Sequence, residues 1–279
     1  MVMFDSAHIG LLIGTVAFLA ISTLVVSKLP RMGQNIAFFM AALYCAAGIF
    51  FRYGMNLSFA GGFDFKTLGT QMLQVCNFNF ILVLLMLIPK FELARQYSVF
   101  FSAAAACTTF VSISSAWKNY QWNDLTVLNS WFNHVFAVAL PLWMVAARRL
   151  KPQKKYIPWV LCLVFIYFTA AYILTKTLID YGILAPGTSF SFLFNTEKVG
   201  LFDMLYALIP YPYFYLLPVF PFFALFCWGW AKLFEKYKVE KFHYYGCISP
   251  PSQKSRIFAS PLVRGGLFSR VYPTLNFVM

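Results

Sequence analysis

The chain has 279 residues, of which 61% are hydrophobic and 11% are charged, so it has too few polar side chains to cover a water-soluble globule. Its net charge of +13 comes from basic residues that stand between hydrophobic runs, which argues against a nucleic-acid binder with one basic face. The composition therefore excludes a soluble fold and indicates a membrane protein built from several helices.

Seven apolar runs, separated by polar residues, proline or glycine, are long enough to cross about 30 Å of hydrocarbon as helices. In chain order they cover residues 9–27, 36–56, 68–88, 97–117, 128–147, 156–177 and 205–231. No basic segment precedes the first run and no small-residue cleavage site follows it, so we interpret it as a membrane span and not as a signal peptide. The predicted fold class is an all-α, polytopic membrane helical bundle of about seven transmembrane helices.

Lys and Arg residues lie in every second connection between the runs, and such residues favour cytoplasmic loops. They are Lys28, Arg31, Lys90, Arg95, Arg148, Arg149, Lys151, Lys154, Lys155, Lys232, Lys236, Lys238 and Lys241. The pattern predicts an N-terminus outside and a C-terminus in the cytoplasm. Residues 1–241 would form the membrane domain, and residues 242–279, rich in Ser, Pro, Gly and basic residues, are expected to be a disordered cytoplasmic tail.

The seventh run differs from the others because it contains several prolines, each of which removes a helix hydrogen bond. They are Pro210, Pro212, Pro218 and Pro221, and they are interleaved with Tyr211, Tyr213 and Tyr215. The outer end of this span is therefore expected to be broken. The three tyrosines are expected at the level of the lipid headgroups, where aromatic rings with one polar end prefer to lie.

The third and fifth runs both enter the membrane from outside and carry polar side chains in their outer halves. At 1.5 Å per helical residue, Cys76 lies roughly 12 Å and His134 roughly 9 Å below the outer surface. Because a thiol reacts as its thiolate, an imidazole at the same depth would suit it as a base. A buried Cys is also often an inert small residue, and a buried His often bridges helices, so the spacing leaves both interpretations open.

Several short stretches occur together in a recognisable order. They are residues 73–77 (LQVCN), 131–134 (WFNH), 149–152 (RLKP), 201–203 (LFD) and 210–215 (PYPYFY). In this order and spacing the chain resembles the YwaF-like integral membrane family, whose eukaryotic relatives are the transmembrane protein 164 group. The resemblance covers about residues 4–235.

The resemblance implies an acyltransferase that moves a fatty acyl chain from a phospholipid onto a cysteine and then to a lysophospholipid, with a histidine as base. By the motif match the nucleophile is Cys76 and the base is His134. Depth and charge type add candidate oxyanion or orienting groups and candidate groups for the lipid headgroup. The former are Asn77, Asn79 and Asn133, and the latter are Arg52, Lys198 and Asp203.

The six cysteines show no metal-ligand spacing, so neither a metal nor a cofactor is expected. The other membrane cysteines, Cys45, Cys107, Cys162 and Cys227, are assigned to packing. The expected partners are membrane phospholipids and lysophospholipids, with no nucleic acid, and the oligomeric state and the choice of lipid or water as acceptor stay open. The short loops favour a multi-pass protein of a bacterial cell membrane.

Two other functions remain open from the sequence. The same polar residues could line the path of a small-solute transporter or channel, but such a path would continue through the inner halves of the spans, which carry few polar residues. The chain could also be a non-catalytic, lipid-binding membrane bundle.

Overall fold

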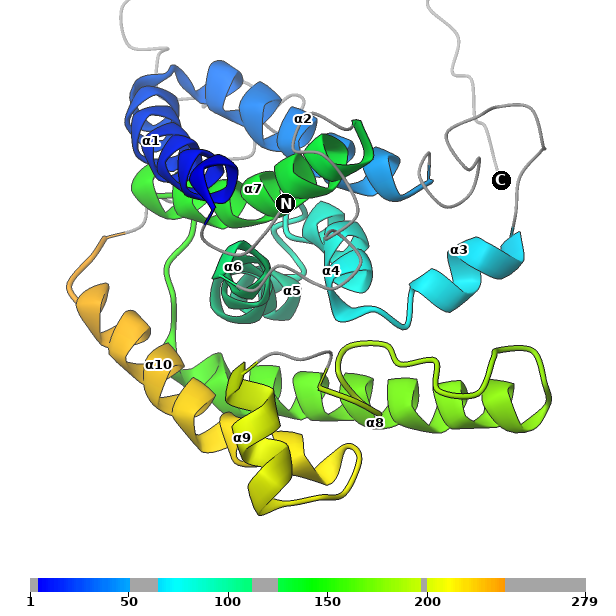
Figure 1. Ribbon diagram of the computed structural model, residues 1–279. Helices are drawn as coiled ribbons and strands as arrows, with labels where there is room; N and C mark the ends of the chain where they lie inside the picture. The colour runs from blue at the N-terminus through cyan, green and yellow to red at the C-terminus, as the bar shows by residue number, and fades with distance from the viewer. Residues whose placement is uncertain (1–4, 51–64, 112–124, 197–199, 239–279) are drawn as a thin grey trace, which may run out of the picture. The chain divides into compact units, whose positions relative to one another are not determined.

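The computed structural model describes residues 5–50, 65–111, 125–196 and 200–238, and these residues are helical and contain no strand (Figure 1). The helices are α1 (Ser6–Lys28), α2 (Arg31–Ile49), α3 (Phe65–Gln71), α4 (Val75–Leu85), α5 (Glu92–Tyr97), α6 (Ala103–Val111), α7 (Leu125–Ala146), α8 (Ile157–Asp180), α9 (Gly200–Leu208) and α10 (Val219–Leu233). One π-helical turn, Ser98–Ser102, joins α5 to α6. The 3₁₀ turns Lys154–Tyr156 and Phe214–Leu216 precede α8 and α10. The predicted all-α class is confirmed for these residues.

Four helical stretches in the described part of the chain are long and apolar enough to cross a membrane. They are Ser6–Lys28, Arg31–Ile49, Lys154–Asp180 and Phe214–Leu233. Each of the seven predicted ranges overlaps helix, but the third is divided into α3 and α4, and the π-helical turn lies between the two helices of the fourth. The protein is thus a membrane protein with several apolar helices, while seven crossings and their orientation remain predictions. The tail, residues 242–279, lies outside the described residues.

Local sequence explains where several helices begin and end. The carboxylate of Asp5 accepts a hydrogen bond from the backbone N–H of His8 at 2.8 Å and so caps the start of α1. Pro30, which lacks an N–H, separates α1 from α2. The expected break in the seventh run is confirmed, because α9 ends at Leu208 and α10 begins only at Val219, directly after a proline.

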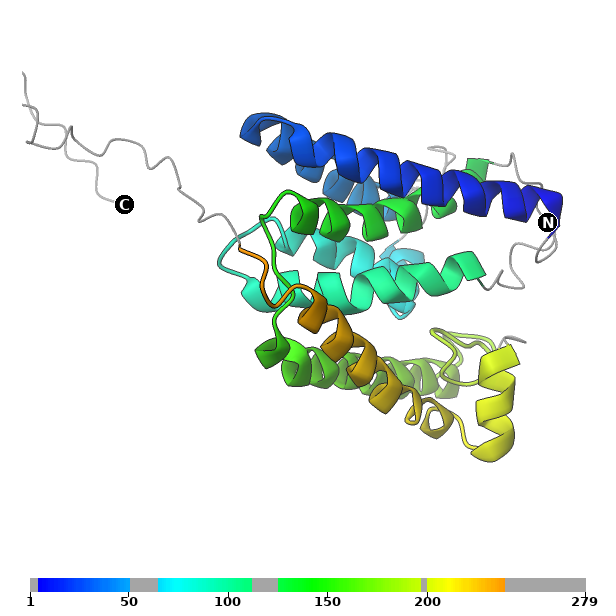
Figure 2. The same ribbon diagram turned by 90° about the vertical axis from the view of Figure 1, so that its left-hand side faces the viewer.

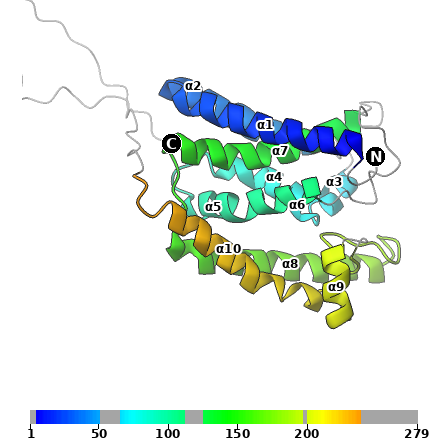
Figure 3. The ribbon, with the colours of Figure 1, turned by 60° about the vertical axis from the view of Figure 1, so that its left-hand side comes forward.

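The helices pack around α7. It contacts α1, α2 and α6, and α2 also packs against α4, while α8 contacts α5 and α10. Figures 2 and 3 show α8, α9 and α10 on the side of α5 and α6 that faces away from α1 and α2. The largest side chains buried in the main core include Trp131, Tyr97, Phe80, Phe100 and Leu140.

The basic connections between the helices meet at one end of this bundle (Figure 3). Arg95, before the π-helical turn, donates a hydrogen bond to the backbone carbonyl of Arg149, which follows α7. Arg149 in turn donates to the Asn35 side-chain oxygen of α2 at 3.0 Å. Lys154 forms an ion pair with Glu235, beyond α10, at 3.1 Å. One end of the bundle is therefore strongly basic.

The three tyrosines between α9 and α10 differ in exposure, and their level in the membrane remains a prediction. Tyr211 is 65% exposed, but Tyr213 and Tyr215 are buried. The Tyr215 hydroxyl donates to the backbone carbonyl of Phe192, and the Tyr213 and Thr169 hydroxyls are 2.7 Å apart. Both rings pack inside the protein because the chain between α9 and α10 folds back onto the segment that follows α8.

Candidate active site

A break in the third predicted span lies directly before Cys76. Residues Met72 to Gln74 leave the helical path although this segment contains neither proline nor glycine. Gln74, the residue before α4, makes no side-chain cap of its own. Instead the hydroxyl of Ser191, from the segment after α8, accepts a hydrogen bond from the Val75 N–H at 2.7 Å. The break is therefore held by a tertiary contact and not by local sequence.

Several polar groups at the break have partners in distant segments. Ser191, which is 1% exposed, also donates its hydroxyl to the Leu73 carbonyl at 3.0 Å, and its backbone N–H donates to the Gln74 side-chain oxygen at 2.7 Å. The Tyr167 hydroxyl of α8 donates to the Met72 carbonyl at 2.9 Å. An interrupted helix inside a membrane protein needs such partners, because unpaired backbone groups are costly there.

This break makes Cys76 the second residue of a new helix. The side chain is half-buried, and its sulfur lies 4.0 Å from the Thr109 hydroxyl of α6. The positive end of the α4 dipole favours a negative charge at this position, as do hydroxyl groups that can donate to sulfur.

His134 lies on α7 and is held by its own helix. The side chain is 6% exposed, and its Nδ1 is 2.7 Å from the backbone carbonyl of Ser130, one turn earlier. Since a carbonyl oxygen only accepts hydrogen bonds, Nδ1 carries a hydrogen. In the neutral ring Nε2 is then the nitrogen with a lone pair, so the imidazole is oriented to act as a base through Nε2.

Cys76 and His134 share neighbours on two helices. Phe80, one turn after Cys76 on the same face of α4, packs its ring against the His134 ring with 4.9 Å between centroids. On α6, Thr109 contacts Cys76, and the next residue, Phe110, has its ring centroid 6.4 Å from that of His134. The structure therefore brings the two predicted catalytic residues into the same region, where α4, α6 and α7 meet.

The three predicted asparagines lie in three different settings. Asn77 donates to the Gln71 carbonyl at 3.0 Å and so stabilises the break. Asn79 accepts a hydrogen bond from the Tyr97 hydroxyl at 2.7 Å, and its side-chain nitrogen has no partner among the described residues. Asn133 is 1% exposed and faces Gly48 of α2, where an added Cβ would meet its amide at 2.7 Å.

Of the predicted headgroup residues, only Asp203 lies in the described part of the chain. It is exposed on α9, and its carboxylate accepts a hydrogen bond from the Thr196 hydroxyl. Arg52 and Lys198 lie outside the described residues. The structure therefore does not test whether these three side chains lie together.

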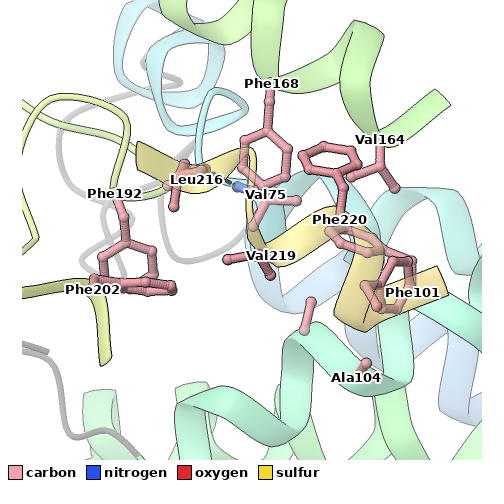
Figure 4. Close-up of a pocket in the computed structure, with 13 residues that line it drawn as sticks. Val75, Phe101, Ala104, Val164, Phe168, Phe192, Phe202, Leu216, Val219 and Phe220 are labelled. Atoms are coloured by element: carbon pink, nitrogen blue, oxygen red, sulfur yellow. Dashed lines mark hydrogen bonds between the residues drawn. The ribbon is translucent and has the colours of Figure 1, made fainter. Parts of the chain in front are cut away.

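An apolar pocket of about 170 Å³ adjoins the first turn of α4 (Figure 4). Its lining includes Val75 and Ser191, which are the two residues joined at the break before Cys76. The other walls are almost entirely hydrocarbon and come from the π-helical turn, α6, α8, the segment after α8, α9 and α10. They include Phe101, Ala104, Val164, Phe168, Phe192, Phe202, Val219, Phe220 and Phe223. Figure 4 shows Phe192 and Phe202 gathered at one side of this pocket and Phe101 and Phe220 at the other.

A second apolar cavity, of about 640 Å³, lies between α6, α7 and α10. The two cavities share Ala104, Val219 and Phe223 in their walls. Cys107, which we assigned to packing, is exposed and lines this second cavity. The two cavities therefore adjoin each other along α6 and α10.

Several residues of this region could not be found by sequence reasoning. Ser191, Tyr167 and Thr109 are ordinary polar residues in apolar surroundings, and nothing in their spacing indicates partners 33 to 118 positions away. His8 is fully buried, with its Nε2 2.8 Å from the Phe110 carbonyl. For Tyr167 and Thr109 the available signal was a polar residue within a hydrocarbon run, whereas Ser191 and His8 lie outside the seven predicted runs.

Comparison with known proteins gives one match. The model of the TMEM164 family matches residues 3–232, which include Cys76, His134 and both cavities. No curated protein and no solved structure matches the chain. The match confirms the predicted relation to the transmembrane protein 164 group and does not test the YwaF-like label. The chain belongs to the TMEM164 family.

Proposed function

We propose that this membrane protein is a lipid acyltransferase in which Cys76 carries the acyl chain as a thioester and His134 moves the proton. The observation that supports it best is the position of Cys76. It lies at the start of a helix whose capping residues, Val75 and Ser191, form part of the wall of an apolar pocket. A nucleophile at a helix N-terminus beside a hydrocarbon pocket suits a substrate with an ester at the end of an alkyl chain.

In the first half-reaction, His134 Nε2 takes the proton of the Cys76 thiol. The thiolate attacks the carbonyl carbon of a phospholipid ester, so that a C–S bond forms and the ester C–O bond breaks. The leaving oxygen of the lysophospholipid receives the proton from His134. The backbone N–H groups of the first turn of α4, other than that of Val75, which donates to Ser191, would stabilise the negative oxygen formed in this step.

In the second half-reaction, a hydroxyl of a lysophospholipid gives its proton to His134 Nε2, and its oxygen attacks the thioester carbon. The C–S bond breaks and the Cys76 sulfur takes the proton back. Water in place of the lysophospholipid would make the same site a lipid hydrolase. The apolar walls exclude water from the pocket and so favour the lipid acceptor.

The remaining predicted residues are given supporting roles in this proposal. Asn79 and Tyr97 lie on the Cys76 side of α4 and would orient the polar part of the site. Asn77 and Asn133 are candidates for oxyanion or orienting contacts, and Arg52, Lys198 and Asp203 for the lipid headgroup. The bundle would cross the membrane seven times, with its basic end in the cytoplasm and Cys76 in the outer half.

A transfer assay tests this function. The purified chain is reconstituted in vesicles that contain a phospholipid with a labelled acyl chain and an unlabelled lysophospholipid, and label in the acceptor is measured. Cys76→Ser is expected to abolish transfer, because the weaker hydroxyl nucleophile lacks a thiolate. Cys162→Ser, the same change at an exposed cysteine of α8 that lines neither cavity, is expected to keep it. Equal transfer by both variants would exclude the covalent step.

The same vesicles separate the competing functions. Uptake of a solute that is unaffected by Cys76→Ser would favour a transporter or channel. Lipid that co-purifies with the protein, without transfer and without reaction of Cys76 toward an acylating reagent, would favour a non-catalytic lipid-binding bundle.

A further inference from the structure

A polar pocket lies at the basic end of the bundle, where α1, α2 and α7 meet. Its volume is about 350 Å³, and its lining comes from the turn between α1 and α2 and from the end of α7. Figure 3 shows this turn at the end of the bundle opposite to α3 and the loop that follows α8. The pocket is therefore separate from the Cys76 site.

The chemistry of the pocket favours an anion. Among the residues that line it are two arginines, Arg31 and Arg148, and no carboxylate. Both arginines are exposed, and Arg31 is the first residue of α2, where the positive end of the helix dipole adds to its charge. Two arginines that line one pocket suit a phosphate, because a guanidinium group can bind phosphate oxygens in pairs.

Hydrogen bonds of Gln34 and Arg149 fix the walls of the pocket to each other. Gln34, which is 7% exposed, donates to the Leu29 carbonyl at 3.1 Å and to the Ser27 carbonyl at 3.3 Å, and so holds the turn between α1 and α2. Arg149 donates to the Gln34 side-chain oxygen at 3.4 Å and joins this turn to the end of α7. The two arginines are thus carried by elements that are fixed to each other.

Arg148 occupies a backbone conformation that favours glycine. It follows α7 with a φ of +58°, at the place where helices commonly end in a left-handed residue. A residue with a Cβ costs about 1 kcal/mol there relative to glycine. The side chain nevertheless lies at the pocket, and its guanidinium carbon is 5.8 Å from the centre of the Tyr237 ring.

The position of the pocket indicates where its anion comes from. Both α1 and α2 are long and apolar enough to cross a membrane, and the pocket lies at the short connection between them. Such a connection lies at the membrane surface, at the level of the lipid phosphates. We propose that this arginine pocket binds the phosphate of an anionic phospholipid headgroup. This proposal does not depend on the proposed acyl transfer.

Lipid binding to the purified full chain tests the proposal. The protein in a neutral detergent is titrated with phosphatidylglycerol, with phosphatidylcholine as reference, and bound lipid is counted by native mass spectrometry. One phosphatidylglycerol is expected to bind at concentrations at which phosphatidylcholine does not. Arg148→Gly and Arg31→Gln are each expected to weaken this binding by about fivefold.

Two controls keep the result specific. Lys155→Gln removes the same charge from an exposed residue outside the pocket and is expected to leave binding unchanged. Arg148→Gly relieves the left-handed conformation, so its thermal midpoint is expected to equal or exceed that of the wild type. If the thermal midpoint is retained, a loss of phosphatidylglycerol binding in Arg148→Gly does not come from unfolding.

Three outcomes would overturn the proposal. The first is unchanged phosphatidylglycerol binding in Arg148→Gly, and the second is an equal loss in Lys155→Gln, which would indicate attraction to the basic surface in general. The third is displacement of the lipid by inorganic phosphate at equal concentration, which would identify a free anion as the occupant.

Discussion

The hydroxyl of Ser191 and the backbone N–H of Val75 lie 2.7 Å apart, although the two residues are separated by 116 positions in the chain. This hydrogen bond caps α4 from outside, immediately before Cys76. It also joins the segment after α8 to the break between α3 and α4. Because Val75 and Ser191 both line the apolar pocket, the bond fixes this part of the pocket wall. The position of the proposed nucleophile is thus set by a distant residue.

Ser191→Ala removes this cap. The buried N–H of Val75 and the Leu73 carbonyl then lose a partner, so the free energy of unfolding in mixed micelles is expected to fall by about 1–3 kcal/mol. The reaction of Cys76 with a thiol reagent is expected to slow, because the helix end is no longer fixed. Rates and stabilities are measured on the same preparations.

The matched control for this change is Ser189→Ala. The Ser189 hydroxyl accepts hydrogen bonds from the Phe194 and Asn195 N–H groups within its own loop, and no hydrogen bond joins it to α4 in the described part of the chain. The Ser189→Ala substitution is expected to leave the reactivity of Cys76 unchanged. If Ser191→Ala behaves like Ser189→Ala, the cap does not position Cys76.

A second prediction concerns the buried hydrogen bond from the Tyr97 hydroxyl to the Asn79 side-chain oxygen. Tyr97→Phe leaves the buried Asn79 oxygen without its donor, and Asn79→Leu leaves the Tyr97 hydroxyl without its acceptor. Each change is expected to cost about 1–3 kcal/mol of unfolding free energy. The double variant is expected to cost less than the sum, because it removes both polar groups together. Strictly additive losses would show that the two side chains act independently.

A third prediction concerns the wall that the two cavities share. Ala104→Phe would fill the junction between them, so transfer of long acyl chains is expected to fall by at least tenfold while short chains are still transferred. Leu225→Phe, at a residue that is 66% exposed on α10 and lines neither cavity, is the control. If Ala104→Phe reduces the transfer of short and long acyl chains equally, the acyl chain does not bind at this junction.

Sequence patterns predicted the helices well because apolar runs report directly on burial in lipid or protein. The break before α10 was predicted because Pro210, Pro212 and Pro218 remove helix hydrogen bonds. The break before α4 was not predicted, since the segment 72–74 contains no residue that interrupts a helix locally. It depends on Ser191 and on contacts that form only when the chain is folded.

In the candidate site, too, local sequence predicted some features, while others depend on contacts that form only in the folded protein. Depth along two helices was sufficient to bring Cys76 and His134 to the same region, because a helix rises by a fixed amount per residue. The rotation of each side chain about its helix was harder to predict. Asn133 directly precedes His134 but faces Gly48 on α2, since consecutive helical residues point about 100° apart. The partner of Asn79, Tyr97, required knowledge of how α4 and α5 pack.

Peptide mass spectrometry after incubation with phospholipid vesicles tests the central claim most directly. The account predicts an acyl group on the peptide that contains Cys76, released by neutral hydroxylamine as a thioester, and a much lower yield in His134→Ala. The peptides that contain Cys107 and Cys162 are internal controls, because both thiols are exposed and neither lies beside the capped helix end. No adduct on Cys76 in a preparation that transfers acyl chains, or an equal adduct on all three cysteines, would contradict it.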